Sequence, residues 1–209
     1  MPHSPDNLPL ALYSAAQVRA LDARLIAAGT PGFELMTRAA HAIWRALRRR
    51  WPAAGAITVL AGRGNNAGDG YLVAALALRA GWQVQVLAVG DPALLQGDAA
   101  QARDEALAAG VRIQPWSECA TLSGVVVDAL LGTGLSGAVR EPSAQAIALL
   151  NASGLPVLAV DIPSGLCADS GQVLGVAVRA QLTVTLIGLK LGLFTGIAAD
   201  WVGEVQFAD

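Results

Sequence analysis

The stretch ITVLAGRGNNAGDG, residues 57–70, is the part of the sequence that decides the fold. Its first five residues form a short continuous apolar run, which is typical of a β-strand covered on both faces of a parallel sheet. Glycines close this run, and the pattern of a helix over residues 69–80 follows directly. A buried strand, a glycine-rich turn and a helix in this order predict an α/β fold, in which a mostly parallel sheet lies between layers of helices.

The same alternation of helices and strands continues on both sides of this stretch. Upstream, Ser14 stands three residues before a glutamine, the spacing of a capping box, and Val18, Leu21 and Leu25 then recur at helical spacing. A second apolar stripe predicts a helix over residues 33–50. Downstream, strands are expected at residues 83–89, 111–114, 125–128, 157–161 and 182–187, and helices at residues 96–109 and 143–151. The prediction is therefore a three-layer αβα sandwich.

Length and composition predict one globular domain over residues 1–209, with a leader at residues 1–12 and an ordered core from about residue 13. A chain of 209 residues with 54% hydrophobic and 14% charged residues is large and apolar enough to bury a core. The formal net charge of −2 gives no electrostatic footprint for nucleic acid or for an anionic membrane. A dissolved small molecule is the expected partner.

Cysteine usage and the chain ends predict a cytoplasmic location. The two cysteines, Cys119 and Cys167, lie far apart, which suggests neither a disulfide framework nor a zinc cluster. No secretory signal and no apolar run of membrane-spanning length is present. The sequence stops at Asp209, directly after strand-like residues, so we expect it to be a domain excised from a longer protein.

The first candidate site is the loop at residues 62–70, because open parallel sheets bind ligands beyond the carboxyl ends of their strands. Four glycines allow main-chain N–H groups to approach an anion beside the positive end of the next helix. Asn65, Asn66 and Asp69 add oxygens that suit a cation or sugar hydroxyls. A plainer interpretation stays open, in which these three side chains only cap the helix.

Two further loops follow acids at the ends of apolar strands. Asp128 precedes GTGLSG, residues 132–137, which offers free N–H groups and two hydroxyls but is also compatible with a flexible surface connection. Asp161 is stiffened by Pro163, as catalytic bases often are, although such an acid can also cap a turn. Lys190, the only lysine of the chain, follows the strand predicted at residues 182–187 and would either pair with an acid or extend to the surface.

Four ordered segments carry a resemblance to a known family: GRGNNAGDG at residues 62–70, DALLGTGLSG at 128–137, DIPSG at 161–165 and TLIGLKLG at 185–192. Together they resemble the NAD(P)H-hydrate epimerases, whose core is called the YjeF N-terminal domain. The resemblance implies a Rossmann-like αβα sandwich, usually a homodimer. It also implies an activity that interconverts the R and S forms of NADH and NADPH hydrated at C6 of the nicotinamide ring.

The resemblance also assigns roles to particular residues. Together with their place at strand ends, the family pattern predicts that Asp161 and Lys190 are catalytic. Asp161 would act as general acid and base, and Lys190 would pair with it or with the departing oxygen. One potassium ion per subunit is held by Asn66, Asp128 and Ser164. The hydrated dinucleotide is a substrate, not a cofactor, and its binding residues are Asn65, Asn66, Ala67, Gly68, Asp69, Gly132, Thr133, Gly134, Leu135, Ser136, Gly137, Ala138 and Asp161.

The chain departs from the family pattern at Ala67, where glycine is frequent, and alanine fits there only if φ is negative. In many bacterial relatives this domain precedes an ADP- or ATP-dependent dehydratase, which would be absent from this chain. The main alternative is a non-catalytic nucleotide- or RNA-binding module of the same fold. A nicotinamide dehydrogenase fits less well, because Gln83 and Gln85 occupy the next strand where an acid is expected.

Overall fold

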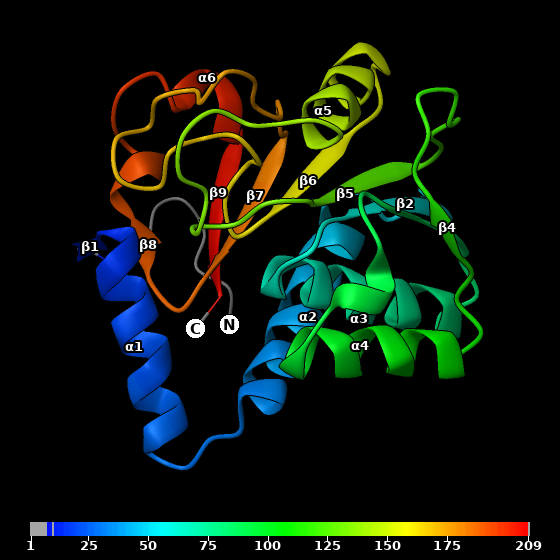
Figure 1. The fold of residues 1–209 in the computed structure, drawn as a ribbon, viewed down its shortest axis with the longest axis horizontal. Coiled ribbons are helices and arrows are strands. Elements are labelled where there is room, and N and C mark those ends of the chain that lie inside the picture. Colours follow the sequence, from blue (N-terminus) through cyan, green and yellow to red (C-terminus); the bar gives the residue numbers. More distant parts are fainter. Residues whose placement is uncertain (1–7, 10, 209) are drawn as a thin grey trace.

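A seven-stranded parallel sheet forms the centre of the molecule (Figure 1). The computed structural model describes residues 8–9 and 11–208, so most of the expected leader at residues 1–12 lies outside the described residues. The strands have the order β4-β3-β2-β5-β6-β7-β9. Their bounds are β2 (Ala56–Ala61), β3 (Gln83–Ala88), β4 (Ile113–Pro115), β5 (Val125–Ala129), β6 (Val157–Val160), β7 (Leu182–Leu186) and β9 (Glu204–Ala208).

Counted from β2 as the first strand, the run from β4 to β7 has the order 3-2-1-4-5-6 of dinucleotide-binding sheets, and β9 extends the edge. In such a sheet the chain turns in opposite directions from the first and fourth strands, which are β2 and β5 here. Ligands bind at that switch point, where the loops after the two strands diverge. The topology therefore places the candidate site beyond the carboxyl ends of β2 and β5.

Helices cover both faces of the sheet, which confirms the predicted αβα sandwich. Three helices pack on one face: α2 (Gly32–Arg50), α3 (Asn65–Arg79) and α4 (Gly97–Ala108). The other face packs against α5 (Ser143–Ala152), and α6 (Ala199–Val202) lies at the β9 end. The 3-10 turns η2 (Pro92–Leu94) and η3 (Leu191–Leu193) complete the connections. None of the helices within the described residues is both long and apolar enough to cross a membrane.

Helix α3 begins four residues earlier than expected, so the polar residues of the glycine-rich segment lie in its first turns. Glycine disfavours helix, which led to a loop prediction. Here packing overrides that preference, because a Cβ at Gly70 would lie 2.6 Å from the Ala129 Cβ. Ala67, inside the helix, has no positive φ, so the condition for tolerating alanine is met.

Helix α1 (Ala15–Ala27) stands away from the sheet and forms a wall over its carboxyl edge (Figure 1). The predicted capping box at Ser14 is present. The apolar stripe is only partly used, however, since Val18 is buried but Leu25 is 41% exposed. Before α1, the short strand β1 (Leu12–Tyr13) pairs in parallel with β8 (Leu189–Lys190), an arrangement that the sequence did not predict.

Candidate active site

A cavity of about 760 Å³ lies at the switch point, at the carboxyl ends of the central strands. Its floor and sides come from the segments after β2, β5 and β6, and α1 and α2 close another side. Asn65, Asn66 and Asp69 line it from α3, and Asp161 lines it from the end of β6. The cavity is large enough for a small organic ligand or a nucleotide.

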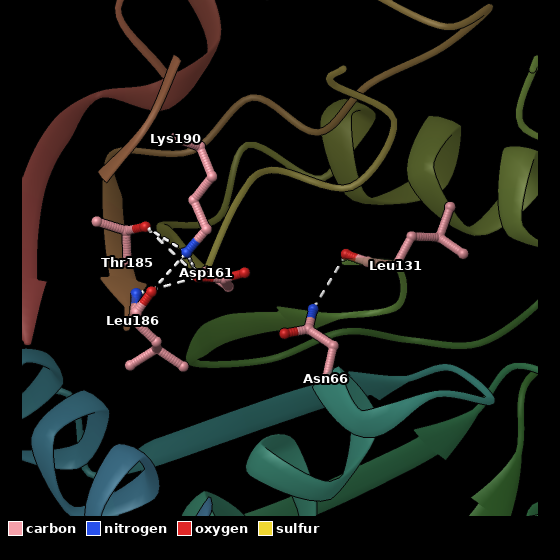
Figure 2. Close-up of polar contacts among 6 residues, drawn as sticks. All are labelled: Asn66, Leu131, Asp161, Thr185, Leu186 and Lys190. Carbon is pink, nitrogen blue, oxygen red and sulfur yellow. Dashed lines mark hydrogen bonds and ion pairs between the residues drawn. The ribbon is translucent and has the colours of Figure 1, made fainter. Parts of the chain in front are cut away.

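Asp161 and Lys190 form an ion pair at one end of this cavity (Figure 2). The ammonium of Lys190 donates to Asp161 Oδ1, to Thr185 Oγ1 at 3.0 Å and to the Leu186 carbonyl at 2.7 Å. All three of its N–H donors are therefore used, and its side chain is 0% exposed. The alternative of a surface lysine is wrong, because the Lys190 side chain is buried and does not line the cavity, whereas Asp161 does.

The two oxygens of Asp161 have different surroundings. Oδ1 accepts from Lys190, from the Leu186 amide at 3.0 Å and from Thr185 Oγ1 at 3.4 Å. No described residue donates a hydrogen bond to Oδ2, and Asp161 lines the cavity. The carboxylate is thus fixed through one oxygen, while the other is available to a ligand.

The backbone around this pair adopts strained conformations. Asp161 has a φ of 67° and Ile187 a φ of 64°, and a positive φ is a clear outlier for a β-branched residue such as isoleucine. Such strain concentrates at functional sites, where surrounding contacts maintain it. The Asp161 amide donates to the Val184 carbonyl at 2.8 Å, which ties the turn after β6 to β7.

A second polar network, buried beneath the cavity, joins three of the predicted residues. The Ser164 amide donates to Asp128 Oδ2 at 2.8 Å, and its hydroxyl donates to Oδ1 at 2.6 Å. The Leu131 amide donates to Ser164 Oγ at 2.9 Å, and Asn66 Nδ2 donates to the Leu131 carbonyl at 3.0 Å (Figure 2). Leu131 therefore links Asn66 to the Asp128–Ser164 pair.

Burial raises the pKa of two carboxyl groups in this region. Asp128 is fully buried, and desolvation raises its pKa to about 6, against the opposing hydrogen bonds from Ser164 and Leu130. For Asp69, burial and then the nearby charge of Asp161 raise the pKa well above its usual value. The cavity therefore combines an ion-paired carboxylate, Asp161, with a second carboxyl group, Asp69, whose pKa is raised.

The oxygen-rich network is chemically suited to a hard cation. Oxygen atoms are offered by the side chains of Asn66, Asp128 and Ser164 and by the Leu131 carbonyl. The Asp128 carboxylate is buried, and no cationic side chain among the described residues binds it. Within the described part of the chain there is no group of three His, Cys, Asp or Glu residues that could hold a metal ion. An ion here would depend mainly on neutral oxygens, which fits a monovalent cation.

The structure brings most of the predicted residues to the cavity, but not all of them. Those that line it are Asn65, Asn66, Asp69, Gly132, Thr133, Gly134, Leu135, Ser136, Ala138 and Asp161. Ala67 and Gly68 are turned into the packing between helices, and Gly137 is also outside the lining. Asp128, Ser164 and Lys190 are buried and do not line the cavity. The helix-capping alternative for the first loop fails, because Gly64 is the N-cap and no side chain caps α3.

Several lining residues were not predicted from the sequence. Arg19 and Asp22 face the cavity from α1, and Arg63 and Arg140 line it from loops. Arg19 reaches across to the Thr133 carbonyl at 3.4 Å. Thr185 lay inside a quoted segment, but nothing in the pattern marked it as a partner of the ion pair. For the α1 residues, the sequence offered one signal, a charged residue beside the apolar stripe of the predicted helix. This pattern is too common in helices to mark a binding site.

The sheet order, the switch-point cavity and the acid mounted at a strand end define a doubly wound α/β protein with a small-molecule site. The model of the family described as YjeF-related protein N-terminus matches residues 32–192. The chain belongs to this family. Its fold is similar to the crystal structure of the yeast protein YNL200c, with a TM-score of 0.79 at 22% identity, covering 88% of this chain and 83% of that one.

Relatives with a described activity show similarity over most of the chain. It is 46% identical over 195 residues to the bifunctional NAD(P)H-hydrate repair enzyme Nnr of Coxiella burnetii, covering 93% of this chain and 40% of that protein. It is 39% identical over 199 residues to the NAD(P)H-hydrate epimerase of Limosilactobacillus fermentum, covering 94% of this chain and 95% of that protein. The chain thus spans about two fifths of the bifunctional relative and nearly all of the epimerase.

Proposed function

We propose that this chain is an NAD(P)H-hydrate epimerase, which interconverts the R and S forms of hydrated NADH and NADPH at C6 of the nicotinamide ring. The observation that carries the proposal is the Asp161 carboxylate, held through Oδ1 by Lys190 and Leu186 and open to the cavity at Oδ2. Similarity over nearly the whole length of the Limosilactobacillus epimerase supports it. The non-catalytic alternative has no comparable support.

The reaction requires proton transfer but no change in oxidation state. The C6 hydroxyl accepts a proton and leaves as water, while the lone pair of the ring nitrogen forms a C=N bond and a cationic ring. Water then adds to the opposite face of C6 and releases a proton. One acid–base group can balance both steps if it gives its proton directly on one face of C6 and recovers a proton from the other face through a water molecule.

In this mechanism Asp161 takes up a proton from solvent on Oδ2 when the substrate binds and delivers it to the departing hydroxyl. The carboxylate so formed recovers, through a bridging water molecule, the proton that the entering water releases on the opposite face of C6. Lys190 is the positioning residue, because its three N–H donors are used within the protein and it is fully buried. It therefore orients Asp161 and does not bind the departing oxygen. Asp69, whose pKa burial raises, is suited to donate a hydrogen bond to a substrate oxygen.

The remaining parts of the proposal concern the ion and the assembly. Asn66, Asp128 and Ser164 would hold one potassium ion, which would supply positive charge near the substrate phosphates. The helix N-terminus at Asn65 and the loop at residues 132–136 would face those phosphates. We further propose a cytoplasmic homodimer, with a dehydratase domain fused in the parent protein as in the bifunctional relatives.

Substitution of Asp161 by asparagine tests the proposed function. The side chain keeps its shape but cannot transfer protons, so epimerisation should slow by about 10²- to 10⁴-fold. The rate is measured by chromatographic separation of the two epimers after mixing one pure epimer with the enzyme. Asp200→Asn, the same change at an exposed position, is the matched control and should retain the wild-type rate. An unchanged rate in Asp161→Asn would remove this residue from the mechanism.

A further inference from the structure

The Arg63 side chain lines the cavity from the segment after β2, whereas Asp161 lines it from the end of β6. The stem of the Arg63 side chain lies across Gly90, which follows β3. A Cβ at Gly90 would be 2.7 Å from Arg63 Cδ and 2.9 Å from Cγ. Glycine at position 90 therefore leaves the space in which the arginine crosses the end of β3.

The guanidinium of Arg63 forms no hydrogen bond or ion pair with any residue that the structure describes. The nearest acid along the chain from Gly90, Asp91, is engaged elsewhere, since its Oδ1 accepts from the Ala93 amide at 2.9 Å. Arg103, on α4, is also engaged, with the Pro92 carbonyl at 2.6 Å and with Asp104 at 2.7 Å. On its β3 side the cavity is thus lined by a cation without a described partner, whereas Asp91 does not line it.

The sheet topology indicates which part of a bound dinucleotide would lie beside Arg63. A 3-2-1-4-5-6 sheet has two mononucleotide-binding halves that meet at the switch point. Asp161 belongs to the half formed by β5, β6 and β7, and Arg63 to the half formed by β2, β3 and β4. The ends of β3 and β6 are three strand spacings apart, roughly 14 Å. With the nicotinamide at Asp161, the adenosine half lies over β2 and β3.

In sheets of this order, the strand after the first crossover helix carries the group that reads the adenosine ribose. An acid there binds a 2′-hydroxyl, and an arginine nearby accommodates a 2′-phosphate. That strand is β3, and at its end Arg63 lines the cavity while Asp91 does not. We propose that Arg63 binds the 2′-phosphate and so makes hydrated NADPH the preferred substrate over hydrated NADH. This inference rests on the proposed function.

The test compares both substrates in wild type and three single variants. Arg63→Ala should lower kcat/KM for hydrated NADPH by roughly 10- to 100-fold, the size expected for one lost charge-assisted contact. For hydrated NADH it should stay within about twofold, since no 2′-phosphate is present. Arg63→Lys should fall between, because lysine keeps the charge but not the bidentate geometry. Arg79→Ala, which removes an exposed arginine at the far end of α3, should change neither substrate.

Three kinetic results would overturn the proposal: an equal loss for both substrates, no loss for hydrated NADPH, or a wild-type preference for hydrated NADH. Titration calorimetry with NADP⁺ and NAD⁺ provides a readout that does not need turnover. Arg63→Ala should weaken NADP⁺ binding by the same 10- to 100-fold and leave NAD⁺ binding within about twofold. If wild type turned over neither substrate, the epimerase proposal would fail. Selective loss of NADP⁺ affinity would still support Arg63, and unchanged affinity would refute it.

Discussion

Replacing Lys190 by methionine tests how far the buried ion pair maintains the site. Methionine has a similar length but provides no charge and no N–H donor. The change leaves Asp161 without its cation and deprives the Leu186 carbonyl and Thr185 Oγ1 of a donor. Removing one partner of a buried pair typically costs 3–5 kcal/mol of folding free energy. Because the Asp161 side chain retains 16% exposure, we expect a loss near the lower end, about 3 kcal/mol.

Catalysis should respond as well, because a carboxylate that shifts by about 1 Å loses roughly 10²-fold in rate. We expect this loss in kcat, with KM little changed, since Lys190 does not face the cavity. Urea unfolding, followed by tryptophan fluorescence, measures the stability, and the epimer assay measures kcat. Arg79→Met, the same replacement of a cation at an exposed position, should cost less than about 0.5 kcal/mol.

A double-mutant cycle separates the ion pair from general damage to the core. In an Asp161→Asn background there is no carboxylate charge to compensate, so Lys190→Met should cost at least about 1 kcal/mol less than in wild type. The double variant also remains informative if Lys190→Met alone fails to fold. Equal costs in both backgrounds, or a loss under about 1 kcal/mol in wild type, would refute the reasoning.

Three further outcomes follow from the buried network and the close helix packing. Because burial raises the Asp128 pKa from 3.8 to about 6, the folded state holds this proton more tightly than the unfolded state. Without potassium, the stability of wild type relative to Asp128→Asn should therefore fall as pH rises from about 4 to 6. A pH-independent difference between the two proteins in urea unfolding would contradict this. At pH 7.5, potassium at a hundredfold excess over its Kd should stabilise wild type by about 2.7 kcal/mol relative to an equal concentration of choline. Potassium should give no such stabilisation of Ser164→Ala, and a thermal shift assay measures both proteins. Gly70→Ala should destabilise the fold by about 1–3 kcal/mol despite alanine's higher helix propensity, because the new Cβ would clash with the Ala129 side chain. A Cβ at Gly134 would have no neighbouring atom within 4 Å, so Gly134→Ala should be neutral in the same unfolding assay.

The sequence predicted the order of the main elements because apolar periodicity reports directly on burial. The run at residues 57–61 is strand β2 with one residue added, and the helix at residues 143–151 is α5 with one residue added. The start of α3 could not be predicted from local preference, since the close contact of Gly70 with Ala129 exists only after the sheet has formed. The pairing of β1 with β8 likewise joins segments too far apart in sequence for any local pattern to show it.

The candidate site was predictable where it depends on strand ends and not where it depends on tertiary contacts. Asp128 and Asp161 follow apolar strands, and parallel strands bring their carboxyl ends to one edge. The positive φ of Asp161 and its anchoring by the Leu186 amide involve the neighbouring strand β7. The wall contributed by α1 could not be predicted, because periodicity gives the direction of an apolar stripe but not the partner that it meets.

The most direct test of the account is the structure of Asp161→Asn crystallised with hydrated NADPH. The account predicts the nicotinamide ring beside residue 161, with the C6 oxygen about 2.6–3.2 Å from the side-chain amide and the phosphates near Asn65 and residues 132–136. A nicotinamide ring bound outside the cavity, or at the β3 end with adenosine beside residue 161, would contradict it.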